Sequence, residues 1–325
     1  MKSYGFPLLA LAFGLMLGLA GPARAQPGDF MEWLAGLKRD AAAQGVSAAT
    51  LDRALTGVQP LPRVLELDRK QPEGTLTLAR YIDNVVKPER IAKGRQLKAE
   101  EKALLGSISD RYGVPPKVVM ALWAVESGFG ASMGSFRVVD ALATLAFDGR
   151  RPELFRAELI NALKILGRGR FESEELKGSW AGAMGQVQFM PSTYLHYAVA
   201  YDHGGQPDIW NRHGDVFASA ANYLSTLGWK RDESWGREVQ LPAGFDTRLV
   251  GLPVRHSVTE WGGLGVRRLG GAKLPASSIQ GSIVQPDGPG GRAFLVYDNF
   301  RVIMKWNHST YFAVAVNMLA DGIGN

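Results

Sequence analysis

Glu126 is the residue of this sequence best suited to acid–base chemistry. It lies in the run Pro115–Gly130, which begins with two prolines and ends with glycines, the residues that open and close helices. The spacing of Val118, Leu122 and Val125 gives that helix an apolar face. Glu126 falls at the edge of this face, where the helix dipole and partial burial both raise a carboxyl pKa. A raised pKa suits a general acid, although an ordinary solvated glutamate remains the alternative.

A second segment, from Leu176 to Tyr194, combines glycine and alanine with polar and aromatic side chains. Small residues let a backbone approach a bulky ligand closely. Ser179 and Gln188 offer neutral hydrogen-bonding groups, and Trp180 and Phe189 lie beside them. This combination is typical of a sugar site. The alternative is a glycine-rich turn whose aromatic side chains fill the core, and the pattern alone does not decide between them.

Helices are expected to position both segments, because helical periodicity runs from Asp29 to about Leu227. The sharpest signals predict helices at residues 116–127, 152–167, 191–200 and 215–228. From Trp235 to about Asp298, short alternating runs separated by Gly and Pro predict a small β-rich insert.

Three further runs have local patterns that predict extended or helical structure. Arg248–Val254, inside the insert, and Phe300–Trp306, after it, are rich in branched and aromatic residues and are expected to be extended. Ser309–Leu319 returns to a helical pattern.

Composition excludes several functional classes. The 325 residues, 46% of them hydrophobic, can bury a large core. The net charge is +6, but the sequence has no run of basic residues that could follow a nucleic-acid backbone. The absence of cysteine excludes disulfides, thiolate metal sites and a cysteine nucleophile. The five histidines form no His-x-x-x-His pair, so a zinc hydrolase is not expected.

Residues 1–25 have the pattern of a cleaved secretory signal. Lys2 precedes an apolar run from Phe6 to Ala20, and small residues at Ala23 and Ala25 suit a signal peptidase. The run is shorter than the roughly 20 apolar residues that span a bilayer. We therefore expect export and no permanent membrane span after cleavage.

The chain resembles the lytic murein transglycosylases of the B type, which are periplasmic enzymes with a lysozyme-like core. Seven segments match in order over about residues 29–320. They are Tyr112-Gly-Val-Pro-Pro, Val125-Glu-Ser-Gly-Phe-Gly, Asp140-Ala-Leu-Ala-Thr-Leu-Ala-Phe, Leu176-Lys-Gly-Ser-Trp-Ala-Gly-Ala-Met-Gly, Gln188-Phe-Met-Pro-Ser, Ala221-Asn-Tyr-Leu and Trp306-Asn-His-Ser.

This resemblance implies an α+β, mainly helical fold with five parts. These are a signal peptide at 1–25, a helical subdomain at 26–105, a catalytic core at 106–234, the β-rich insert at 235–298 and a return to the core at 299–325. It also implies a periplasmic enzyme whose substrate is the glycan strand of peptidoglycan, without a cofactor. Protein partners are unknown.

The resemblance implies roles for individual residues. Glu126 is the single catalytic acid and base. The residues implied to bind the substrate are Ser179, Gln188, Phe189, Tyr223, Trp306 and Asn307 for the glycan, and Arg150 and Arg151 for its peptide side. Trp306 stands where the family often has tyrosine, which keeps a stacking face and loses a hydroxyl.

Family members often carry a calcium loop after the Gln-Phe-Met-Pro-Ser helix. Here Asp202, Asp208 and Asp215 remain, but Ala200 and Gly204 replace oxygen ligands. Because calcium takes about six to eight oxygens, this degenerate loop is not expected to bind it.

The implied reaction cleaves the β-1,4 bond between N-acetylmuramic acid and N-acetylglucosamine and forms a 1,6-anhydro end. Hydrolysis of the same bond and non-catalytic glycan binding are the alternatives. Asp140, Asp148 and Glu153 follow Glu126 and are the candidates for the second carboxylate that many hydrolases use. The simpler interpretation is that Asp140 caps a helix and Asp148 lies in a turn.

Overall fold

The computed structural model describes residues 27–70, 76–202 and 204–324, and its contacts divide the chain into two compact units. The first unit contains residues 27–70 and the described part of 122–222, and the second contains residues 76–121 and 223–324. The expected signal peptide at 1–25 lies outside the described residues. Within the described ranges, every helix is too short or too polar to cross a bilayer.

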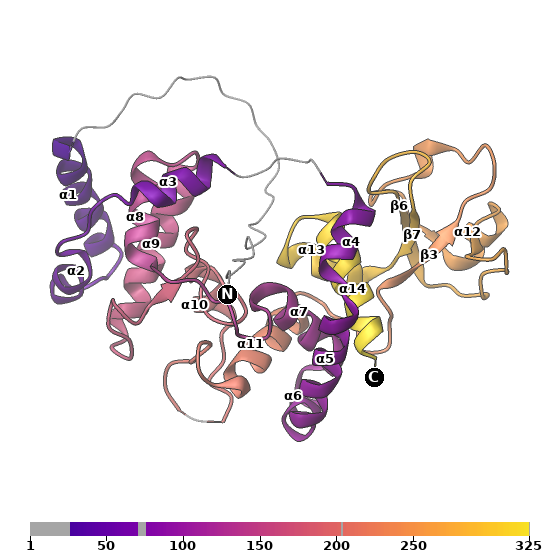
Figure 1. Ribbon diagram of the computed structural model, residues 1–325, viewed down its shortest axis with the longest axis horizontal. Helices are drawn as coiled ribbons and strands as arrows, with labels where there is room; N and C mark the ends of the chain where they lie inside the picture. The colour runs from indigo at the N-terminus through magenta and orange to yellow at the C-terminus, as the bar shows by residue number, and fades with distance from the viewer. Residues whose placement is uncertain (1–26, 71–75, 203, 325) are drawn as a thin grey trace, which may run out of the picture. The chain divides into compact units, whose positions relative to one another are not determined.

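The first unit is mainly helical (Figure 1). Helices α8 and α9 pack against each other, α2 and α10 pack against α9, and α3 packs against α8. In chain order its elements are α1 (Pro27–Ala43), α2 (Ala48–Leu55), α3 (Pro62–Arg69), the end of α7 (Pro116–Ser127), β1 (Phe136–Arg137), α8 (Val138–Asp148), α9 (Pro152–Gly167), β2 (Lys177–Gly178), α10 (Pro191–Tyr197) and the start of α11 (His213–Thr226).

The core of the first unit follows from the apolar pattern of α8 and α9. Helix α8 is apolar nearly all round, and every residue from Val138 to Ala146 except Asp140 is buried, as expected of a core helix. Helix α9 begins with Pro152 at its first turn and buries Phe155, Leu159 and Leu163 on one face. The predicted helices at 116–127 and 152–167 are confirmed at both ends.

The second unit combines helices with a five-stranded sheet (Figure 1). Helix α14 packs against α4, α5 and α13, and the sheet has the order β4-β6-β7-β3-β5 with every pair antiparallel. Its elements are α4 (Leu78–Val85), α5 (Pro88–Glu100), α6 (Lys102–Tyr112), the start of α7, β3 (Gly236–Gln240), η1 (Thr247–Leu249), β4 (His256–Ser257), α12 (Val258–Gly263), β5 (Arg267–Arg268), β6 (Gln280–Val284), β7 (Ala293–Val296), α13 (Asp298–Trp306) and α14 (Thr310–Ile323).

The predicted α+β, mainly helical fold with a β-rich insert is confirmed. All strands of the larger sheet lie within residues 235–298, and Val239, Trp261, Ile283 and Leu295 form part of a hydrophobic core of their own. The predicted division into parts at 26–105, 106–234, 235–298 and 299–325 is finer than the two contact units and stays a prediction.

Two local predictions are wrong. Arg248–Val254 is not a strand, because the Asp246 carboxylate accepts from the Arg248 N–H and caps the short η1 helix. Phe300–Trp306 is helical, within α13. Its apolar residues recur every three or four positions, and one face is buried, so tertiary packing overrides the strand preference of the branched side chains.

A buried glutamine holds the end of α7 in the first unit. The Trp123 Nε1–H donates to Gln186 Oε1 at 2.7 Å, and Gln186 Nε2 donates to the Trp210 carbonyl at 2.7 Å. The Gln186 backbone N–H also donates to the Ile209 carbonyl at 2.8 Å. Trp123 and Gln186 are 2% and 6% exposed, so water cannot replace these bonds. One side chain therefore ties α7 to two loops.

Replacing Gln186 by Met should lower the free energy of unfolding by about 2 to 4 kcal/mol, because the Trp123 indole N–H and the Trp210 carbonyl lose their buried partner. Urea denaturation measures the change. Gln44, which is exposed in the same unit, provides the control: Gln44→Met should change stability by about 0.5 kcal/mol or less. Equal losses for the two variants would contradict the clamp.

Candidate active site

Glu126 lies in the last turn of α7 and is half-buried. The three residues Gly128, Phe129 and Gly130 that follow the helix have φ values of 60°, 62° and 80°. Phe129 is the unusual member, since a residue with a side chain rarely adopts this left-handed conformation. Its backbone N–H donates to the Trp123 carbonyl, and its ring packs edge-on against Trp123 at 5.3 Å. The chain turn next to Glu126 is thus anchored on the clamped tryptophan.

Gly130 lies against the clamp itself. A Cβ at Gly130 would meet Gln186 Oε1 at 2.5 Å and Cδ at 2.9 Å, so no side chain fits there. The Gly130 N–H donates to Ser127 Oγ at 2.9 Å. The segment after Glu126 is therefore held on both sides, which limits the movement of the helix end that carries the Glu126 carboxyl group.

The glycine-rich segment 176–194 packs closely against its own protein. A Cβ at Gly134 would lie 2.0 Å from the Gly178 carbonyl oxygen, and one at Gly178 would lie 2.3 Å from the Ala183 oxygen. These glycines permit backbone-to-backbone contact within the first unit. The described contacts therefore account for them without a ligand.

Ser179 and Gln188 shape two turns of this segment. Ser179 Oγ accepts from the Ala183 N–H at 3.0 Å, which leaves the hydroxyl proton out of that bond. Gln188 has a φ of 50°, and its Nε2 donates to the carbonyls of Gly185 at 2.8 Å and Met133 at 3.2 Å. Phe189 is 2% exposed, so its ring lies in the core, as the alternative interpretation of this segment expected.

The two arginines lie where α8 connects to α9. The Arg150 guanidinium donates to the Asp68 carbonyl at 2.8 Å, and its Nε lies 3.4 Å from the carboxylate of Asp68, which is buried. Arg151 precedes α9 and places its guanidinium 5.5 Å from the centre of the Phe155 ring. Arg150 thus neutralises a buried carboxylate and anchors this corner.

The remaining predicted residues form a group of their own in the second unit. The Tyr223 hydroxyl donates to the Lys305 carbonyl at 2.6 Å, and its ring lies edge-on to Trp306 at 4.9 Å. Asn307 directly follows α13, and its Oδ1 is buried without a hydrogen-bond partner in the described part of the chain. Tyr223 therefore supports the end of α13, where Trp306 and Asn307 are half-buried.

The candidate second carboxylates have different surroundings. Asp140 lies in the first turn of α8, with Oδ1 at 3.7 Å from the Arg137 guanidinium, and burial raises its pKa above the ordinary value. Asp148 ends the same helix, 3.8 Å from Arg69, rather than lying in a turn. Glu153 is exposed on the first turn of α9.

The three aspartates of the degenerate calcium loop have protein donors as partners. Asp202 pairs with Arg212 at 2.9 Å, and Asp215 accepts from the N–H groups of Tyr201 and Asp208. The described residues contain no group of three or more acidic or histidine side chains that could hold a metal ion. The donor set of this loop does not fit calcium.

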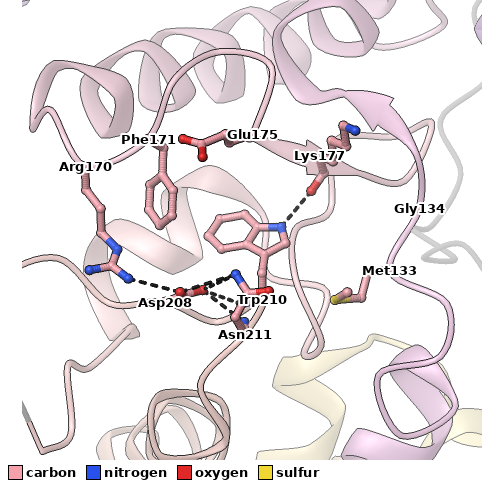
Figure 2. A pocket seen from close by; sticks show the side chains of 9 residues that line it. All are labelled: Met133, Gly134, Arg170, Phe171, Glu175, Lys177, Asp208, Trp210 and Asn211. Atoms are coloured by element: carbon pink, nitrogen blue, oxygen red, sulfur yellow. Dashed lines mark hydrogen bonds and ion pairs between the residues drawn. The ribbon is translucent and has the colours of Figure 1, made fainter.

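Asp208 accepts hydrogen bonds from several neighbours (Figure 2). Burial alone would raise its pKa, but hydrogen bonds from Asn211, Trp210 and Arg170 lower the pKa below the ordinary value. The Arg170 guanidinium lies 3.0 Å from Asp208 Oδ2. The carboxylate is therefore ionised at neutral pH and neutralised by an arginine.

The residues that sequence reasoning missed are those that hold the site rather than carry its chemistry. Gln186 lies two positions before Gln188 in the same segment, and no local signal distinguishes an internal clamp from a ligand-binding amide. Arg170 and Trp210 lie outside the quoted motifs, and only their contacts connect them to the segment.

The chain matches the family model of the transglycosylase SLT domain over residues 29–321. It is similar to the membrane-bound lytic murein transglycosylase B of Escherichia coli (strain K12), with 33% identity over 252 residues, which are 75% of this chain and 66% of that protein. The matched part spans just under two thirds of that relative's length.

Solved structures show the same similarity. The structure of SltB3 from Pseudomonas aeruginosa in complex with NAG-anhNAM-pentapeptide has a TM-score of 0.87 and 46% identity, covering 90% of this chain and 79% of that one. The Escherichia coli lytic transglycosylase Slt35 in complex with calcium has a TM-score of 0.74 and 30% identity, covering 90% and 92%. The predicted lysozyme-like core is thereby confirmed. The chain belongs to the lytic transglycosylase family that its sequence motifs indicated.

Proposed function

We propose that this chain is a peptidoglycan lytic transglycosylase that cleaves the β-1,4 bond between N-acetylmuramic acid and N-acetylglucosamine and leaves a 1,6-anhydro end. The observation that carries the proposal is the position of Glu126, half-buried on a helix end that the Trp123–Gln186 bond holds in place. The SltB3 structure with NAG-anhNAM-pentapeptide, a ligand that contains an anhydro sugar, supports this choice of product.

The proposed mechanism needs one carboxyl group in two protonation states. Protonated Glu126 donates to the departing glycosidic oxygen while positive charge develops at the anomeric carbon. The N-acetyl oxygen of the muramic acid stabilises that carbon. Ionised Glu126 then accepts the proton of the 6-hydroxyl, which attacks the same carbon and closes the anhydro ring. The hydroxyl competes with water because it is already held next to the carbon.

The predicted substrate-binding residues have proposed roles that agree with the contacts each of them makes. In the first unit, Ser179 and Gln188 are the proposed glycan-binding residues and would act through neutral groups. In the second unit, Trp306 and Asn307 are the proposed glycan-binding residues. Tyr223 positions the end of α13, because its hydroxyl is bonded to the Lys305 carbonyl. Phe189 supports the segment from the core. Arg150 and Arg151 are proposed to lie near the peptide side of the substrate, with Arg150 also anchored to Asp68.

We place the enzyme in the periplasm, with residues 1–25 as its cleaved export signal and peptidoglycan strands as its partner. The curated relative is named as membrane-bound and as acting on murein, which is consistent with work at the cell wall.

Hydrolysis and non-catalytic binding of the same glycan are the competing functions. Mass spectrometry of digested murein separates them, because the anhydro product is one water lighter than the hydrolysis product.

Glu126→Gln should lower the release of anhydro-muropeptides by about a thousandfold or more, because the amide cannot transfer the proton. Liquid chromatography of purified murein digests measures the release. Glycan binding should persist, since the amide keeps the size of the side chain.

Glu153→Gln is the matched control, since this carboxylate is exposed on α9 of the same unit. It should retain the activity of the unmodified chain. Continued release of anhydro-muropeptides by Glu126→Gln would refute the assignment of the catalytic acid. A comparable loss in Glu153→Gln would indicate a second acid.

Calcium should leave the thermal stability of this chain unchanged. Arg212 and Arg170 already pair with Asp202 and Asp208, so a cation gains few free oxygens. Differential scanning fluorimetry with calcium chloride and with a chelator measures the melting temperature. Slt35 is the positive control, because its solved structure is a complex with calcium. A rise that grows with calcium concentration would show binding to the folded state and contradict this prediction.

A further inference from the structure

The β-rich insert, residues 235–298, contains more basic side chains than its carboxylates can neutralise. Three carboxylates form ion pairs at 2.6, 2.8 and 2.7 Å, which are Glu238 with Arg292, Asp246 with Arg248 and Asp298 with Arg255. The other two accept hydrogen bonds, Glu260 from Ser257, and Asp287 from Leu78 and Tyr311. The basic residues of the insert that have no ion pair in the described part of the chain are Arg237, Arg267, Arg268 and Lys273.

Three of these four cations lie in one short segment, which we call the basic turn and define as residues 267–273. It begins with β5, the strand at the edge of the sheet next to β3. The chain then turns back, because the Arg268 N–H donates to the Ala272 carbonyl at 2.8 Å and the Gly271 N–H donates to the Arg268 carbonyl at 3.0 Å. Residues 261–286 around the turn include no aspartate or glutamate. The basic turn therefore concentrates positive charge without a counter-charge nearby in sequence.

The fold places two of these charged residues opposite each other. Arg267 and Lys273 form an antiparallel β-bridge across the turn. Arg267 Nη1 donates to the carbonyls of Gly262 at 2.8 Å and Val266 at 2.9 Å, which orients the guanidinium. Like charges directly opposite each other destabilise a strand pair. An anionic surface in contact with the basic turn would reduce this repulsion.

The apex of the basic turn is apolar and open to solvent. Leu269 is 58% exposed, and its neighbours from Arg268 to Lys273 are all exposed as well. A Cβ built at Gly270 or Gly271 would meet no atom within 4 Å, so the described part of the chain leaves both sides of the apex uncovered. The turn therefore projects from the insert and presents a leucine between cations.

Protection of the sheet edge explains only part of this pattern. Charged residues on an edge strand prevent it from pairing with another sheet, which accounts for Arg267 and Arg268. It does not account for Leu269, because an exposed leucine at the apex favours association. A small anion would contact the cations and leave the leucine in water, and a projecting turn does not enclose it. A lipid bilayer offers both contacts, since its phosphates lie at the surface and its hydrocarbon directly below.

We propose that the basic turn docks on a bilayer surface rich in anionic phospholipid. Arg268 and Lys273 bind the phosphate groups, and Leu269 enters the boundary between headgroups and acyl chains. Each cation near such a surface gains an attraction that a neutral lipid surface does not supply. The contact is peripheral and reversible. It is a binding function of the insert, and it does not depend on the reaction proposed for Glu126.

Sedimentation with lipid vesicles tests the docking. The chain is used without residues 1–25, because the apolar run from Phe6 to Ala20 would itself bind lipid. One set of vesicles contains phosphatidylglycerol and phosphatidylcholine in equal parts, and the other contains phosphatidylcholine alone. We expect binding to the first set that weakens as salt is added, and binding to the second set that is at least about tenfold weaker. Arg268→Gln and Lys273→Gln should each lower the partition coefficient on the anionic vesicles by about fivefold.

A third variant separates a bilayer from a soluble polyanion. Leu269→Ser should lower the partition coefficient on the anionic vesicles by about three- to fivefold, because the apolar contact is lost. It should leave the binding of soluble polyphosphate unchanged, as measured by fluorescence anisotropy, whereas Arg268→Gln and Lys273→Gln should weaken that binding. All three side chains are exposed, so the variants should keep the melting temperature of the unmodified chain.

Matched controls come from the same unit. Arg248→Gln removes an exposed charge of the insert that Asp246 already neutralises, and Leu76→Ser removes an exposed leucine outside the insert. Both should bind vesicles as the unmodified chain does, and so should Glu126→Gln, whose activity tests the proposed function separately. Absence of binding, equal binding to both vesicle sets, or equal losses in Arg248→Gln and Arg268→Gln would overturn the proposal. Unchanged vesicle binding by Leu269→Ser would also overturn it, because the partner would then be a soluble anion.

Discussion

The buried bond between the Trp123 indole and the Gln186 amide is the constraint on which the first unit's site depends. It fixes α7 one turn before Glu126, and the same amide donates to the Trp210 carbonyl. Because both partners are almost fully buried, breaking the bond would leave their polar groups without a partner and without water. Other arrangements of these two side chains therefore have a higher free energy. In the proposed reaction Glu126 gives a proton to the departing oxygen and then accepts another from the 6-hydroxyl, and a position that is set before the substrate binds favours both transfers.

The aromatic and charged residues around this clamp serve two different purposes. Trp123 and Phe189 are buried and support the backbone of the first unit that carries the proposed catalytic residue. Arg170 and Arg212 pair with the aspartates Asp208 and Asp202. The support of this part of the first unit comes from hydrogen bonds within the chain.

Local signals correctly predicted the helices that begin at a proline or end before a glycine. Pro116 and Gly128 delimit α7 and Pro152 opens α9, so the position of Glu126 on its helix followed from the sequence. The prediction of an extended run at Phe300–Trp306 was wrong, because its branched residues pack on one face of a helix. Residues distant in sequence determine which conformation buries that face. Gln186 and Arg170 could not be predicted either. Their partners lie 63 and 38 positions away, and nothing near them in sequence specifies those contacts.

In the proposed reaction the sugar's own hydroxyl, deprotonated by Glu126, replaces water as the attacking group. Digestion of purified murein in water labelled with heavy oxygen tests this most directly, with the isotope content of each product read by mass spectrometry. Attack by the 6-hydroxyl gives anhydro-muropeptides without the label. Products whose muramic acid ends carry the heavy oxygen would contradict it, because water would then have attacked the anomeric carbon.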